Sequence, residues 1–306
     1  MAPSALSDVV LAISSFRSEE AVLNLLAQMF ASPGEGFGAV LVIDSLGSGT
    51  IERAIEERGW PVHYSNADSN LGSAGNLALR LQTASETGFG WCYAVNHDGE
   101  VDQRKVKALL ELGLSRERVG AVYPTLILSS ADNRIDAART GFAPFAKLSD
   151  TVSSGGVDEV AWSSSNCALY NLDAVRQGAA AWAELWMGWE DLELGWRLRK
   201  SGWLQLRSRS VTVVDTYEYR RVSVVGRHFF TAAKPAWYSY YQLRNLVLIA
   251  RRTRFGAVGP GAIVRRMLVD IGLTLFVRPQ KFKRLMLLFR GLIDGLRGRS
   301  GMGPVP

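Results

Sequence analysis

Apolar and polar positions along the first hundred residues form blocks that predict strands and helices in alternation. Short apolar runs that end in small polar residues are typical of buried strands, whereas apolar residues three and four positions apart indicate helices with one buried face. Beginning with a strand, the segments lie at 8–16, 18–30, 39–45, 50–59, 61–66, 70–88 and 91–100. This order predicts an α/β fold: a Rossmann-like, mainly parallel sheet with helices on both faces.

The pattern between residues 101 and 225 is less regular. It predicts a helix at 103–113 and a second one that starts near 172. Strands are expected at 119–128, 159–171 and 204–217. Beyond about residue 225 the spacing of apolar residues becomes helical. We therefore expect a sheet domain over residues 1–225 and a helical extension over residues 226–306.

The composition is that of a folded cytosolic protein. The chain has 306 residues, of which 47% are hydrophobic and 21% charged. Cys92 and Cys167 lie in apolar surroundings without metal-site spacing, so we expect reduced thiols. The first residues lack the basic start of a signal peptide. No apolar run approaches the roughly 20 residues of a membrane-spanning helix. These features predict a cytoplasmic protein.

Positive charge is concentrated at the C-terminal end. The whole chain carries +6, but residues 251–306 hold 12 Lys or Arg and 2 Asp or Glu. Within them, residues 281–296 form a helical apolar stripe. One interpretation is a helix packed on the sheet domain; the other is a helix on the inner face of the cytoplasmic membrane. Nucleic acid is disfavoured, because the rest of the chain is acidic and shows no recognition module. The stripe consists of Phe282, Leu285, Met286, Phe289, Leu292, Ile293 and Leu296.

Polar residues follow each of the first four predicted strands. In parallel sheets, ligands bind outside the carboxyl ends of the strands. The convergence of these residues at one edge therefore indicates a nucleotide-binding face. The residues are Ser14, Ser15, Arg17, Asp44, Ser45, Asn66, Asp68, Asn96 and Asp98.

Two short motifs at this edge suggest phosphate and metal binding. NLGSAGN, at 70–76, places Gly72 and Gly75 at a helix start, where free N–H groups favour an anion. The same motif also suits a plain strand–helix turn. NHDGE follows the fourth strand, and oxygens of Asn96 and Asp98 could hold Mg²⁺ or Mn²⁺ against a diphosphate. The Asp-Gly pair is equally typical of a turn.

The stretch WMGWEDLELGWRLRKSGW, at 186–203, sets Glu190 and Asp191 behind several aromatic residues. Acids in a first helical turn favour the helix dipole, so capping is one interpretation. The other is that one carboxylate acts as a general base, with Trp189 and its neighbours excluding water. The residues alone leave both open.

Taken in order, these motifs resemble the family 2 glycosyltransferases of GT-A fold, and most of all the bacterial branch with rhamnosyltransferases and galactofuranosyltransferases. The resemblance covers about residues 8–250. The acidic helix at 186–203 and YYQLRNLVLIARR at 240–252 are its most specific parts. The other matching stretches are SSFR, VLVIDS, NLGSAGN, NHD and SSSNCALY.

The resemblance implies an inverting, metal-dependent hexosyl transfer. A rhamnose- or galactofuranose-like sugar would pass from UDP or dTDP to a hydroxyl of a cell-surface glycan or its polyprenyl-linked precursor. Residues 1–100 would form the nucleotide-binding half and 101–225 the acceptor half. Asp191 matches the acid that deprotonates the acceptor, with Glu190 beside it. The implied donor-binding residues are Ser14, Ser15, Arg17, Asp44, Asn70, Gly72, Asn76, Asn96, Asp98, Trp189 and Arg244.

The metal site departs from the family pattern in two ways. Asn96 stands where an acid usually begins the DxD-type motif that Asp98 ends, and a neutral ligand should bind metal more weakly. Asp215 stands where a histidine ligand is common, and His228 lies further on. We predict that Asp215 completes a site with Asp98 and Asn96, and that it lies within about 10 Å of Asp98.

Two other functions are compatible with parts of this pattern. A non-catalytic GT-A-fold module that binds a nucleotide or a protein partner would explain Asn96. Retention of Asp98, Glu190, Asp191 and the glycine turn argues against it. A Rossmann dehydrogenase or methyltransferase is disfavoured, because no glycine-rich turn follows the first strand.

Overall fold

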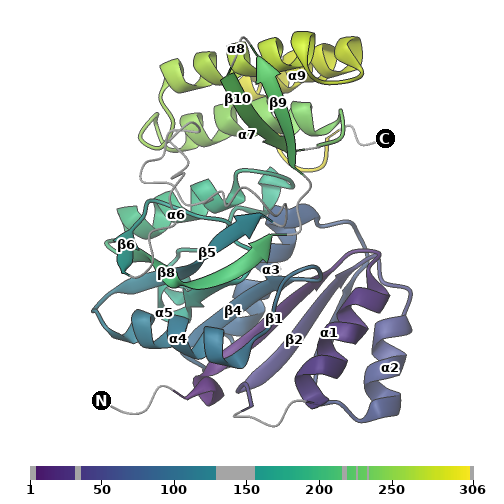
Figure 1. Ribbon diagram of the computed structural model, residues 1–306, viewed down its shortest axis with the longest axis vertical. Helices are drawn as coiled ribbons and strands as arrows, with labels where there is room; N and C mark the ends of the chain where they lie inside the picture. Colours follow the sequence, from purple (N-terminus) through teal and green to yellow (C-terminus); the bar gives the residue numbers. More distant parts are fainter. Residues whose placement is uncertain are drawn as a thin grey trace.

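A mixed eight-stranded sheet forms the centre of the described part of the chain in the computed structural model (Figure 1). The described residues are 5–31, 36–128, 156–215, 219–224, 227–232 and 234–303. The strands are β1 (Val9–Ser15), β2 (Ala39–Ser45), β3 (His63–Ala67), β4 (Trp91–Asn96), β5 (Val119–Leu128), β6 (Val157–Glu159), β7 (Ala168–Asn171) and β8 (Leu204–Asp215). They are ordered β3-β2-β1-β4-β7-β5-β8-β6, and only β7 and β6 run antiparallel to their neighbours. The predicted mainly parallel sheet is confirmed.

Helices cover both faces of this sheet, because its central strands are apolar on both sides. Val9, Leu11 and Ile13 pack under α1, α2 and α4, whereas Val10 and Ala12 pack under α3, α5 and α6. The helices are α1 (Glu19–Ala31), α2 (Thr50–Arg58), α3 (Gly72–Ser85), α4 (Gln103–Leu114), α5 (Leu172–Arg176) and α6 (Glu190–Lys200), with short 3-10 turns η1 (Leu6–Asp8) and η2 (Ala183–Leu185).

The C-terminal helices α7 (Tyr238–Arg252), α8 (Pro260–Phe276) and α9 (Lys281–Leu296) lie at one end of the long axis of the molecule (Figure 1). They join the sheet domain through a shared core, in which Leu185 and Leu192 pack with Leu246 and Ile249 of α7. This helical region was predicted from the apolar spacing. The division into domains at residue 225 remains an expectation.

Two segments differ from their predicted form. The chain beyond 225 does not become helical at once: β9 (Tyr219–Val224) pairs with β10 (Arg227–Ala232) as an antiparallel hairpin before α7 begins. The alternating β-branched and aromatic residues around Gly226 are typical of such a hairpin. The single strand predicted at 159–171 is interrupted: β6 ends at Glu159, an isolated bridge stands at Trp162, and β7 begins at Ala168. Ser and Asn in its middle favour a turn, and Cys167 has a left-handed φ of 59°.

Candidate active site at the carboxyl edge of the sheet

One polar group lies beneath the carboxyl edge on the α1–α2 side of the sheet. Ser15 and Asp44 are register partners on β1 and β2, and each is only 1% exposed. Tyr64 donates a hydrogen bond to Asp44 Oδ2 at 3.0 Å. Burial, with the charge of Asp44 as a second cause, raises the pKa of Tyr64 well above its usual value. Ser15 Oγ and Asp44 Oδ1 have no hydrogen-bond partner within the described residues. Buried polar atoms that lack a hydrogen-bond partner are typical of sites that a water molecule or a ligand occupies.

A second group lies on the α3 side, around the buried guanidinium of Arg80. Its Nη1 donates to the carbonyl oxygens of Ala12 at 3.2 Å and Val95 at 2.8 Å. Its Nη2 donates to Asn96 Oδ1 at 3.4 Å, and Ser14 Oγ donates to the same oxygen at 3.0 Å. Burial lowers the pKa of Arg80 to about 10, so the side chain stays charged at neutral pH. Within the described residues no carboxylate pairs with it.

Asn96, which was predicted to contact the metal and the donor, forms part of this group. An amide oxygen has two lone pairs, and both are used by Ser14 and Arg80. The Asn96 oxygen is therefore engaged within the protein in this structure, and its part in metal binding stays a prediction. Asn76, another predicted donor contact, is 5% exposed and donates to the carbonyl of Ile43 at 3.3 Å.

Asp98 lies in the turn after β4, which is closed by a 2.8 Å bond from Gly99 N to Asn96 O. The Asp98 side chain is exposed. Its neighbour His97 lines a hollow of about 510 Å³ together with Arg17, so the structure brings Arg17 and the NHD turn to one depression.

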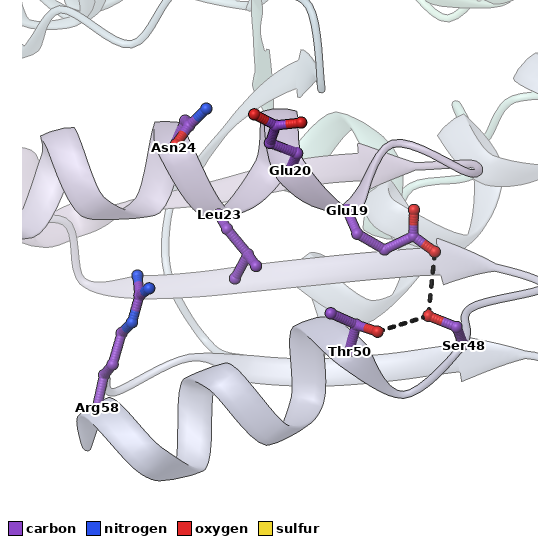
Figure 2. A pocket seen from close by; sticks show the side chains of 7 residues that line it. All are labelled: Glu19, Glu20, Leu23, Asn24, Ser48, Thr50 and Arg58. Carbon is purple, nitrogen blue, oxygen red and sulfur yellow. Dashed lines mark hydrogen bonds between the residues drawn. The ribbon is translucent and has the colours of Figure 1, made fainter.

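A second hollow, of about 540 Å³, lies between α1 and α2 (Figure 2). There Ser48 Oγ donates to Glu19 Oε1 at 3.1 Å, and Arg58 stands at the opposite end. None of the predicted donor-binding residues lines this hollow.

The NLGSAGN turn binds another part of the protein. Gly72 has a φ of 63°, and a Cβ there would lie 2.0 Å from the carbonyl oxygen of Trp186. Two amides at the start of α3 are already used, because Gly72 N donates to Asn70 Oδ1 and Ala74 N donates to Trp186 O. Trp186 Nε1 in turn donates to the carbonyl of Asn70. The close approach that the glycine permits is therefore to Trp186, and these two amides do not face a phosphate.

The turn from Trp186 to Trp189 is strained. Trp186 and Trp189 have φ values of 61° and 68°, and Gly188 between them has 84°. Left-handed backbone at a bulky residue costs on the order of 1–3 kcal/mol and persists only where the surroundings impose it. Such strain is concentrated at functional sites in proteins, and this turn leads directly into Glu190 and Asp191.

Asn245 of α7 imposes this conformation. Its Nδ2 donates to the carbonyl oxygens of Leu185, Met187 and Gly188 at 3.0, 2.9 and 2.9 Å. Arg244 Nη2 adds a bond to the carbonyl of Leu185 at 2.7 Å. The Arg-Asn pair of the YYQLRN stretch is thus the clamp that holds the turn before the acidic pair.

Arg244, which the resemblance implies to be a donor-binding residue, lies in the interior of the protein. It is 0% exposed, and its other nitrogens donate to Asn245 Oδ1 and to the carbonyl of Gly301. The rings of Tyr240 and Tyr241 lie against its guanidinium, at 5.2 and 4.7 Å. Its charge is used in holding α7, the turn and the C-terminal segment together.

Glu190 and Asp191 begin α6. Glu190 is 8% exposed, and its Oε2 has no hydrogen-bond partner within the described residues. Asp191 is half-buried, and its Oδ1 accepts from Leu192 N at 2.9 Å. Beneath it lie Tyr123 and Tyr170, whose pKa values are raised by burial and further by the negative charge of Asp191. The partly exposed carboxylate of Asp191 therefore lies near two buried tyrosine side chains.

Trp189, which was predicted to line the pocket, is half-buried. Its Nε1 donates to the carbonyl of Gln242, and its ring meets Trp162 edge to face, with centroids 6.3 Å apart. The tryptophan thus fixes the start of α6 to α7.

The predicted three-ligand metal site stays a prediction. Asp215 ends β8 and His228 lies on β10, but their side chains are outside the described part of the structure. Among the side chains that are described, no cluster of three or more His, Cys, Asp or Glu could hold a metal ion.

Sequence reasoning missed three residues that shape this site: Arg80, Tyr64 and Asn166. Arg80 falls on the apolar face of its helix, with Leu77 and Ala84, and this position could have identified it. Asn166 Oδ1 accepts from Asn96 N at 2.9 Å and ties the SSSN turn to the end of β4. No simple pattern singles out Tyr64.

Comparison with known proteins gives a match by structure alone. No protein-family model and no curated protein matches the sequence. GalNAc-T7 with UDP, GalNAc and Mn²⁺ matches with a TM-score of 0.61 and 10% identity, over 94% of this chain and 56% of that one. S. aureus TarS in complex with UDP-GlcNAc matches at 0.56 and 11%, over 95% and 81%. A mannosyltransferase from Pyrobaculum calidifontis with GDP-Man and Mn²⁺ matches at 0.54 and 11%, over 94% and 87%.

These likenesses define the fold. The chain has a GT-A type fold, with a mixed, mainly parallel sheet and a C-terminal helical region. It spans little more than half the length of GalNAc-T7.

Proposed function

We propose that this protein is an inverting glycosyltransferase that uses a nucleotide-diphosphate sugar. The observation that carries the proposal is the turn held by Asn245. In this turn Trp186 and Trp189 have left-handed backbone conformations, and the turn leads directly to Asp191 in the first turn of α6. Three solved proteins of the same fold are described with nucleotides or nucleotide sugars: UDP, UDP-GlcNAc and GDP-Man. The fold and the strained acidic turn together favour sugar transfer over other reactions of α/β proteins.

In this reaction, an acceptor hydroxyl attacks the anomeric carbon while the nucleoside diphosphate leaves from the opposite side. Asp191 takes the proton of that hydroxyl as the new bond forms. The buried tyrosines Tyr123 and Tyr170 would restrict water on one side of this carboxylate. Ser15 and Asp44, with unpaired buried oxygens at the carboxyl edge, would accept hydrogen bonds from the donor nucleoside.

A single exposed carboxylate is compatible with a divalent cation whose other ligands are mainly the phosphates of the donor and water. Mg²⁺ is usually bound through one or two carboxylates, with water and substrate phosphates as the remaining ligands. Asp98 would meet this need, whereas the Asn96 oxygen already accepts bonds from Ser14 and Arg80. Mg²⁺ or Mn²⁺ at Asp98 would neutralise the departing diphosphate. We therefore expect metal and nucleotide to bind together.

The sequence resemblance suggests the finer details of the substrates. The sugar would be rhamnose- or galactofuranose-like, and the nucleotide UDP or dTDP. The acceptor would be a cell-surface glycan or a polyprenyl-linked precursor. These assignments rest on motif order and not on any contact in the site.

A thermal-shift titration tests the proposal. The purified protein is heated with UDP, dTDP, GDP or CDP, each with Mg²⁺, Mn²⁺ or a chelator. A ligand at a hundredfold excess over its dissociation constant stabilises the native state by about 2.7 kcal/mol. We expect a shift with UDP or dTDP that grows with metal, and none with metal alone. Flat curves for every combination would contradict donor binding. Transfer is then tested by NMR, which shows whether the anomeric configuration of the product is inverted.

The engaged oxygen of Asn96 supports a second candidate function. A GT-A-fold module without a metal site could bind a nucleotide or a protein partner and perform no transfer. That function predicts nucleotide shifts that do not change when a chelator replaces the metal. A metal-dependent shift accompanied by donor hydrolysis would exclude it.

A further inference from the structure

Helices α8 and α9 expose apolar side chains to solvent and bury charged ones. The inward face of α9 consists of Arg284, Leu287, Leu288, Gly291, Asp294 and Gly295, so it carries both a cation and an acid. The predicted apolar stripe lies on the other side. Its outermost members, Phe282, Met286, Phe289, Ile293 and Leu296, are 46–82% exposed. Helix α9 therefore packs on the rest of the protein, with Leu287 against Trp186 and Tyr241, but the apolar stripe itself faces away from this contact.

The inward polar residues are built into the contact with α7. Asp294 accepts a hydrogen bond from Tyr240 at 2.9 Å, and Arg284 donates to the carbonyl of Lys234 at 2.7 Å. At Gly291 an added Cβ would lie 2.2 Å from the carbonyl oxygen of Tyr240, so the two helices approach closely. These contacts fix α9 in this rotation, and the apolar stripe cannot turn inward without breaking them.

Helix α8 shows the same inversion. Its inward Asp270 forms ion pairs with Arg266 at 2.6 Å and Arg278 at 3.0 Å. Its exposed apolar residues are Val264, Leu268, Val269, Leu275 and Phe276. Phe276 ends α8 and Phe282 is near the start of α9, and they are 80% and 82% exposed. The turn between the two helices therefore presents two large aromatic side chains to solvent.

We propose that the outer face of α8 and α9 docks on an anionic phospholipid bilayer, with Phe276 and Phe282 inserted at the level of the head groups. Exposed apolar surface of this extent is costly in water unless something covers it. The distribution of charge around this apolar face indicates which kind of partner covers it. The only two acids of residues 251–306, Asp270 and Asp294, are buried, whereas Lys281, Lys283, Arg290 and Arg297 are exposed.

An apolar face bordered by cations and free of surface carboxylates complements an anionic lipid surface. The helices would lie on the bilayer: within the described residues no helix is long and apolar enough to cross it. Both helices lie at one end of the long axis, away from the central sheet (Figure 1). The inference stands on α8 and α9 alone and needs neither donor nor metal.

Vesicle flotation tests the inference with the full chain. The probes are phosphatidylcholine vesicles with and without phosphatidylglycerol. We expect binding to the anionic vesicles only, weakened by salt. The double variant Phe276→Ser and Phe282→Ser should lower the partition coefficient about tenfold or more, because each phenylalanine adds apolar area. The matched control is Leu114→Ser on α4, which removes a residue that is also exposed, at 45%, and should bind like the wild type.

A fluorescent reporter gives a second readout. Cys92 and Cys167 are buried, and burial raises their thiol pKa values to about 12 and 11, so a new surface cysteine can be labelled selectively. An environment-sensitive dye on Phe282→Cys should shift to the blue with anionic vesicles, and the same dye on Leu114→Cys should not.

Three results would overturn the inference. The first is no binding to anionic vesicles by either readout. The second is equal binding to neutral vesicles, which would remove the role of the cations. The third is a dimer in light scattering that the serine variants dissociate, which would assign the face to a second copy of the chain. Because vesicle binding is measured without nucleotide, these outcomes are independent of the proposed transferase activity.

Discussion

Gly72 and Trp186 meet backbone to backbone, so closely that a Cβ on the glycine would lie 2.0 Å from the tryptophan carbonyl oxygen. The contact joins the first turn of α3 to the strained turn before the acidic pair. It therefore links the two regions where donor and acceptor are proposed to bind. A side chain at residue 72 would have to separate them.

Gly72→Ala should be strongly destabilising. A left-handed residue with a Cβ costs about 1–2 kcal/mol from its φ alone, and displacing the Trp186 carbonyl adds a further 1–3 kcal/mol. We expect a loss of about 3 kcal/mol in the free energy of unfolding in urea. Gly59→Ala is the matched control, with a φ of 61° but no atom within 4 Å of the added Cβ. Equal losses at the two positions would show that the backbone contact is unimportant.

Asn245→Asp tests the clamp with a substitution of the same size. It replaces the amide that donates to three carbonyls by a carboxylate that would face them. One carboxylate oxygen would keep the bond from Arg244 Nε, but the other would face three carbonyl oxygens without a donor. Buried groups left unsatisfied cost about 1–3 kcal/mol, and we expect this loss in urea unfolding. The control is Asn171→Asp, at the N-cap of α5, where the side chain accepts from Asp173 N at 2.9 Å and a carboxylate is tolerated. A clamp without importance would leave both variants as stable as the wild type.

The fold could be predicted from the sequence because the pattern that determines it is local. Strands such as Val9–Ser15 are apolar on both faces, and α2 ends at Gly59, as glycine stops usually do. The hairpin at 219–232 was missed because apolar residues after 225 were assigned a helical period. The rotation of α9 could not be foreseen, since it depends on which residues of α7 meet its polar face.

The candidate site was predicted as a set of residues but not as a set of contacts. Residue type located Asp44, Asp98 and Asp191 at strand and helix ends. It could not show that Arg80, on a neighbouring helix, reaches the sheet to hold Asn96. Arg244 was assigned to the donor because the family resemblance implies a donor contact at this position. Its burial follows from tertiary packing alone.

Asn96→Asp should restore metal affinity. One carboxylate oxygen would keep the bonds from Ser14 and Arg80, and the oxygen that replaces Nδ2 would be available as a ligand. The buried guanidinium would also gain a counter-charge, which we expect to stabilise the protein on the order of 1 kcal/mol. The measurement is the Mn²⁺ concentration that half-saturates the thermal shift with UDP, which should fall several-fold. The conservative control, Asn96→Gln, adds no charge and should raise it.

Stability should fall at alkaline pH because buried thiols resist ionisation. Burial raises the pKa of Cys92 from 9.0 to about 12 and that of Cys167 to about 11. The unfolded chain loses these protons from about pH 9, so the stabilising contribution is complete below pH 9 and disappears as pH rises towards 12. Each thiol contributes a slope of at most about 1.4 kcal/mol per pH unit.

Urea unfolding between pH 8 and 11 measures that slope, and Cys92→Ala should make it shallower whatever its effect on absolute stability. The same burial predicts that the native protein does not react with a thiol reagent at pH 8 until denaturant is added. Rapid reaction of both cysteines in the native state would contradict the placement of these side chains.

Asp191 and Glu190 should contribute unequally to the rate of sugar transfer. Asp191 is half-buried and remains partly open to solvent, whereas Glu190 is 8% exposed. Asp191→Asn keeps an oxygen for the Leu192 amide but removes the base, so transfer should fall by about 10²–10⁴. The thermal shift with donor nucleotide should be unchanged.

Glu190→Gln should lower the rate of transfer less than tenfold, because Asp191 remains as the general base. It should not destabilise the protein, since it places a neutral amide where a carboxylate oxygen has no partner among the described residues. The measurement is kcat with saturating donor, with KM for the acceptor determined separately. If Glu190→Gln abolished transfer and Asp191→Asn did not, the roles of the two acids would be exchanged. If neither variant lowered kcat, the base would have to come from the acceptor side or from residues outside this helix.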